Sequence, residues 1–115
     1  MGQMQNPPAP SLAAFNDLAD HIDSLFHIQE VDFQTSGAIA DLVARLIQIM
    51  SDDGIYIFAG SWTQHASGYS AMCSKSDYSS TASSWFGIIK DHAGNVWSFT
   101  QRTNGTTNIK QIATA

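Results

Sequence analysis

Aromatic side chains set among hydroxyl and amide residues give this sequence its clearest potential for binding. Trp62, Tyr69, Tyr78 and Trp85 lie among Ser, Thr, Asn and Gly residues in the second half of the chain. Rigid rings provide contact area at low entropic cost, and hydroxyl and amide groups provide adaptable hydrogen bonds. Sugars suit such a surface, although core packing is the alternative for each tryptophan. The candidate binding residues, all expected in or near loops, are Trp62, His65, Tyr69, Tyr78 and Asn104.

Catalytic patterns are weak in this sequence. It contains no Gly-x-Ser-x-Gly, no His-Glu-x-x-His and no phosphate-binding glycine loop. Asp52 and Asp53 precede Gly54, which is typical of a helix end, whereas paired catalytic acids need a defined separation across a cleft. Nothing around His65 and Cys73 supports a base with its nucleophile. We therefore predict that the protein is not an enzyme.

Metal and cofactor binding are also not expected. The four histidines lack metal-ligand spacing. Cys73 is the only cysteine, so no disulfide can form within the chain, and its place in an apolar run predicts a buried structural thiol.

Composition narrows the class of partner. The chain has 115 residues, of which 13% are charged, and its formal net charge is -5 without any Lys/Arg cluster. Nucleic acid and anionic membranes are therefore poor partners. No apolar run approaches the ~20 residues of a membrane span, so we expect no membrane insertion. No charged-then-apolar leader is present, and synthesis in a cytoplasm is expected.

The first 51 residues read as a leader followed by helices. Three prolines predict an extended leader over residues 1–10. A helix capped by Ser11 follows, and its apolar residues fill the a and d positions of two heptads: Leu12, Phe15, Ala19, Ile22 and Phe26. This seam predicts pairing with copies of the chain, and packing on the chain's own β domain is the alternative.

A connector and a second helix come next. Residues 28–35 allow one short strand around Val31 and Phe33. Ser36 then offers a cap for a helix from Ala38 to Met50, whose broad apolar face predicts deeper burial than that of the first helix.

From Gly54 onward, short alternating runs separated by turn residues predict antiparallel strands. The runs at residues 85–89 and 96–99 flank a loop containing Gly94 and Asn95, which predicts a hairpin. Several strands are apolar on both faces, and a lone small sheet can hide only one. We predict an α+β chain: a coiled-coil neck over residues 11–51, then a compact antiparallel β-sandwich-like knob over residues 52–115, forming an oligomer.

Several runs in this second half match one family. They are Asp53-Gly54-Ile55-Tyr56, residues 87–97, the pair Gln101-Arg102, and the closing residues 108–114. In these runs the chain resembles the pyocin-knob-like domains that end bacteriophage tail fibres and tail-like bacteriocins. The tryptophan that usually precedes the closing strand is missing, and Asn104-Gly105-Thr106-Thr107 stands in its place.

The resemblance implies a homotrimer at a tail-fibre tip in the virion, without cofactors. It would contact other tail-fibre components and adhere to a bacterial surface glycan or outer-membrane receptor. A structural tail-tip or connector protein is one alternative, and a carbohydrate-binding lectin-like module is another. A glycan-cleaving enzyme would require an acidic pair in a groove.

Overall fold

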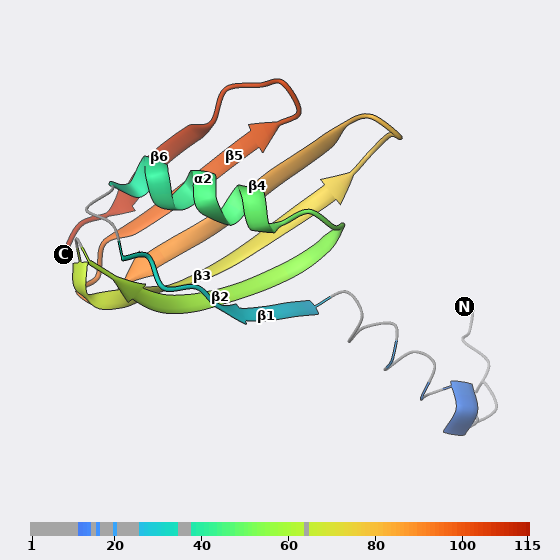
Figure 1. Ribbon diagram of the computed structural model, residues 1–115, viewed down its shortest axis with the longest axis horizontal. Helices are drawn as coiled ribbons and strands as arrows, with labels where there is room; N and C mark the ends of the chain where they lie inside the picture. Colours follow the sequence, from blue (N-terminus) through green and yellow to red (C-terminus); the bar gives the residue numbers. More distant parts are fainter. Residues whose placement is uncertain (1–11, 15, 17–19, 21–25, 35–37, 64) are drawn as a thin grey trace, which may run out of the picture.

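The computed structural model describes residues 12–14, 16, 20, 26–34, 38–63 and 65–115, and of residues 65–67 it describes the backbone alone. Its described part is mostly β, with one six-stranded mixed sheet and a helix on one face (Figure 1). The strands follow one another across the sheet in chain order; β1 and β2 are parallel, and every later pair is antiparallel. The elements are β1 (Phe26–Glu30), α2 (Ile39–Ile49), β2 (Gly54–Trp62), β3 (His65–Asp77), β4 (Ser83–Asp91), β5 (Val96–Arg102) and β6 (Asn108–Ala113).

Helix α2 packs its apolar side against the sheet. Leu42, Val43 and Leu46 are fully buried in the core. Leu46 lies three and four residues after Val43 and Leu42, so the three side chains lie on one face of the helix. The predicted span from Ala38 to Met50 is confirmed to within one residue at each end. The residue that caps the helix is Ala38, without a side-chain hydrogen bond. The predicted cap Ser36 lies outside the described residues.

The covered face of the sheet carries the rest of the core. Two cross-strand rows lie on it: Phe58, Ala71, Ile89 and Trp97 in one, and Tyr56, Cys73, Gly87 and Phe99 in the other. The indole N–H of Trp85 donates a hydrogen bond to the carbonyl of Met50 at 3.0 Å. This bond ties the end of α2 to β4, so the sheet and the helix form one unit.

Gly87 is a glycine because the core leaves no room for a side chain there. A Cβ at this position would lie 2.6 Å from Cys73 Sγ and 2.8 Å from Phe99 Cε2. We expect Gly87→Ala to destabilise the protein by about 2 kcal/mol, as overpacked cores do, and to lower Tm by roughly 8 °C in thermal unfolding. Gly105→Ala, in an exposed loop where a Cβ would lie 3.1 Å from the Arg102 carbonyl oxygen, is the comparison and should lower Tm much less than Gly87→Ala does. An unaltered Tm for Gly87→Ala would contradict this packing.

The opposite face of the sheet, called here the open face, is not covered by any described residue. Phe26, Ile55, Phe86 and Ile88 are exposed on it, and Met72 is 64% exposed. The structure confirms strands with apolar residues on both faces. It contradicts the predicted sandwich, because the described residues form one sheet with a helix on one side only.

The predicted first helix ends too late. Phe26, expected at its last heptad position, is the first residue of β1 and pairs with Ile55 of β2. Leu12, Ala13, Ala14, Asn16 and Asp20 are helical, and Leu12 is 74% exposed. The other predicted seam residues, Phe15, Ala19 and Ile22, lie outside the described residues. The part of the chain that the structure describes therefore shows neither a coiled-coil neck nor a trimer.

The segment after β1 belongs to the same core as the sheet. The amide of Val31 donates to the carbonyl of Ala59 at 2.9 Å, and the amide of Phe33 donates to Ser61 at 2.7 Å. Val31 and Phe33 are buried, so residues on both sides of the predicted boundary at 51/52 share one core. Among the described residues, no helix is long and apolar enough to cross a membrane.

Candidate ligand-binding site

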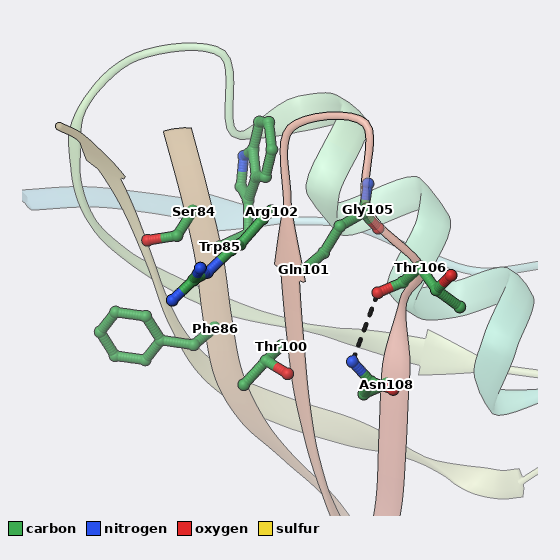
Figure 2. Close-up of a pocket in the computed structure, with 9 residues that line it drawn as sticks. All are labelled: Ser84, Trp85, Phe86, Thr100, Gln101, Arg102, Gly105, Thr106 and Asn108. Carbon is green, nitrogen blue, oxygen red and sulfur yellow. Dashed lines mark hydrogen bonds between the residues drawn. The ribbon is translucent and has the colours of Figure 1, made fainter. Parts of the chain in front are cut away.

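A pocket of about 490 Å³ opens where β4 begins, β5 ends and the chain turns into β6. Figure 2 shows its residues arranged around these strand ends and the loop that joins β5 to β6. The register explains the grouping, because Ser84 pairs with Arg102, and Phe86 pairs with Thr100, which pairs with Asn108. The lining residues are Ser84, Trp85, Phe86, Thr100, Gln101, Arg102, Gly105, Thr106 and Asn108.

The β5–β6 loop is held by several hydrogen bonds. The amide of Gly105 donates to the carbonyl of Arg102 at 2.8 Å, and Asn104 between them adopts a left-handed conformation with φ of 60°. Asparagine tolerates this conformation better than most residues. The amide of Ser83 donates to Thr103 Oγ1 at 2.8 Å, and the amide of Thr103 donates to the Ser83 carbonyl at 2.9 Å. These bonds fix the loop against β4 and give the pocket a stable wall.

The pocket combines an aromatic ring with neutral hydrogen-bonding groups and a cation. Phe86 is 50% exposed, and the alternation of a strand places Thr100 and Asn108 on the same face of the sheet. Asn108 Nδ2 donates weakly to the Thr106 carbonyl at 3.4 Å (Figure 2). Arg102 is exposed. The ion pair found among the described residues joins Lys75 to Asp77 and does not involve Arg102. Such groups suit a hydroxylated ligand with a flat apolar face.

Two of the sequence-predicted binding residues are core residues. Trp62 and Tyr69 were expected in loops but are buried strand residues, with ring centres 6.3 Å apart edge to face. The Tyr69 hydroxyl donates to the carbonyl of Val31 at 2.6 Å, and Trp62 also packs edge to face on Trp97 at 5.5 Å. Neither side chain can reach a receptor, because Trp62 is only 1% exposed and Tyr69 is fully buried.

The other three predicted residues lie apart. Tyr78 is 59% exposed in the turn between β3 and β4, and Asn104 is exposed in the loop beside the pocket. His65 belongs to β3, and its side chain lies outside the described part. Of these three residues, the structure places Asn104 next to the pocket, between the lining residues Arg102 and Gly105.

Of the residues that line the pocket, only Trp85 was among the aromatic side chains singled out from the sequence, and the others were missed. Phe86, Thr100 and Asn108 come from three strands, and only the pairing register sets them side by side. A signal was available: in the predicted strand at residues 85–89, Phe86 falls on the face opposite Trp85.

The groups that could do covalent or metal chemistry lie elsewhere. Cys73 is a free, buried thiol, as predicted, and burial raises its pKa to about 12. A thiol held protonated in this way is a poor nucleophile. Within the described ranges, no group of three His, Cys, Asp or Glu side chains is placed to hold a metal ion.

Comparison of the whole chain with models of protein families, with curated proteins and with solved structures finds no match in any of the three.

Proposed function

We propose that this protein is an attachment module at the tip of a phage tail fibre, binding a bacterial surface glycan or outer-membrane receptor without catalysis. The observation that carries the proposal is the pocket between β4, β5 and β6, with its exposed ring, hydroxyl and amide groups and guanidinium. A sugar ring would stack on Phe86, and its hydroxyls would bond to Thr100 and Asn108. The assignment to a tail fibre rests on the resemblance of residues 53–56, 87–97, 101–102 and 108–114 to knob domains.

Attachment of this kind works through several weak sites on one particle. Copies held together gain avidity even when a single site binds at millimolar concentration. The resemblance implies three copies per fibre tip. The open face supports an assembly of some kind, because Ile28, Met72 and Ile88 are each more than half exposed in one row across neighbouring strands, and exposed apolar patches commonly mark interaction sites.

A structural connector in the tail is the second candidate, and the open face favours it. Such a protein would use the open face to contact another tail component, and the pocket would have no ligand.

Binding of the labelled protein to bacterial cells and to an array of bacterial glycans tests the proposal. We expect Arg102→Ala and Asn108→Ala each to weaken binding about tenfold or more, since a loss at each site multiplies across a multivalent particle. Arg45→Ala, on the exposed side of α2, is the matched control and should bind as the unmodified protein does.

The connector predicts a different pattern. Binding that is unchanged in both pocket variants, or absent from every cell and glycan tested, would contradict the attachment function. Loss of particle assembly in open-face variants, with cell binding intact, would separate the two roles of the molecule.

A further inference from the structure

The open face is ordered into three cross-strand rows over β1, β2, β3 and β4. Because these strands pair in register, each row can be read directly across the sheet. The first row is Glu30, Ala59, Ser70 and Lys90; the second is Ile28, Ile57, Met72 and Ile88; the third is Phe26, Ile55, Ser74 and Phe86.

In the second and third rows the apolar residues stop at β4. The second row continues into Ser98 of β5 and Lys110 of β6, and the third continues into Thr100 and Asn108. Ile28 in β1 is 80% exposed, so the apolar surface reaches the opposite edge of the sheet. The surface that needs a partner is therefore four strands wide, and its centre lies between β2 and β3.

The charges at the two ends of the first row are opposite. Glu30 is on β1 and Lys90 is on β4, and both are exposed. Three strand spacings separate them by roughly 14 Å within one chain, too far for an ion pair. A second copy turned by 180° about an axis that runs along the strands between β2 and β3 would place its β4 over β1. Each Glu30 would then face the Lys90 of the other copy.

The same rotation matches the other two rows. In the second row it sets Ile28 against Ile88 of the other copy and Ile57 against Met72. At the centre of the first row it brings together the small residues Ala59 and Ser70. In the third row it sets Phe26 against Phe86. Packed sheets lie about 10 Å apart with their strands nearly aligned, and this arrangement allows that geometry.

We propose that two copies of this chain pack their open faces together about a two-fold axis between β2 and β3, with two Glu30–Lys90 ion pairs at the rim. This goes beyond the proposed function, and it differs from the threefold assembly that the resemblance implies. The contact is isologous, so every pairing occurs twice. Thr100, Arg102 and Asn108 of the pocket stay outside the contact, whereas Phe86 lies within it, at the boundary between the contact and the pocket.

The mass of the full chain in solution tests the pairing. Four strands and three rows cover roughly 400 Å² of sheet plane, a small interface, so sedimentation should be followed from about 1 to about 500 μM. We expect a mass of twice 12.5 kDa at the upper end of that range. A monomer throughout, or a mass of three chains, would overturn the two-fold pairing; the three-chain mass would leave the tail-fibre proposal standing.

Charge reversal tests the geometry. Glu30→Lys and Lys90→Glu each set like charges face to face twice per dimer, so each should raise the dissociation constant about tenfold or more. The double variant should return to within about threefold of the original value. Both side chains are exposed, so folding should survive. Lys110→Glu, on the open face but beyond β4, is the control, and failure of the double variant to restore pairing would overturn the assigned contact.

Discussion

Replacing Asp91 with alanine is expected to destabilise the protein by about 4 kcal/mol, since it removes a fully buried, hydrogen-bonded carboxylate. Its Oδ1 accepts hydrogen bonds from the amides of Ala93, Gly94 and Asn95 at 2.9 to 3.0 Å. Its Oδ2 accepts another from Asn95 Nδ2 at 2.8 Å. One side chain thus closes the whole β4–β5 turn. Urea unfolding of the variant measures the loss.

Asp32→Ala provides the matched control for this change. Asp32 is exposed and accepts a hydrogen bond from the Ser61 amide at 2.9 Å. A single exposed bond should cost about 1 kcal/mol or less. If Asp91→Ala cost no more than Asp32→Ala, the turn would not depend on the buried carboxylate.

The strands of the second half were predictable because their signals are local. Alternation of apolar and polar residues and the turn at residues 91–95 placed β4 and β5 and the hairpin between them, and the structure confirms that hairpin. The span of α2 was also predictable, since a broad apolar face at helical spacing has few other interpretations.

Strand β1 was predicted only in part, as a short strand within residues 28–35, because the pairing that fixes its position is not local. Phe26 satisfies a heptad spacing, but it also begins the alternating run 26–30, and the sequence alone does not decide between the two patterns. The deciding factor is the parallel pairing of Phe26 with Ile55, far along the chain. Pairing at such separation cannot be derived from a short window of residues.

Gly60 misled the prediction of the binding site. A glycine after an apolar run reads as the end of a strand, which left Trp62 in a loop. In the structure β2 continues through Gly60, because the backbone after β1 lies against it: a Cβ there would be 2.1 Å from the Val31 carbonyl oxygen. The glycine marks a close approach of two segments, so Trp62 and Tyr69 fall inside the core.

The placement of Phe26 in β1 has a consequence for assembly. The predicted oligomer contact was the heptad seam, and Phe26 now belongs to the open face of the sheet. Contact between copies is therefore expected through the open face of the sheet, where the cross-strand rows determine which residues of the two copies face each other.

Two buried acids make the protein sensitive to alkaline pH. Burial raises the pKa of Cys73 from 9.0 to about 12, and burial, with the nearby charge of Asp32 adding to it, raises the pKa of Tyr69 from 10.0 to about 12. The unfolded chain releases both protons at lower pH than the folded chain does. The stabilisation is therefore complete below about pH 9 and is lost as pH rises to about 12.

The expected loss over this range is on the order of several kcal/mol, a large part of the stability of a small domain. We therefore expect the protein to unfold between pH 9 and 12.

Tyr69→Phe should lower stability at pH 7, because the bond to the Val31 carbonyl is lost, yet its stability should fall less steeply with alkaline pH. Cys73→Ala should flatten the profile in the same way. Tyr78→Phe, at an exposed ring, is the control. Urea unfolding at a series of pH values gives each slope, and a slope in both core variants equal to that of the unmodified protein would show that these two protons do not govern alkaline unfolding.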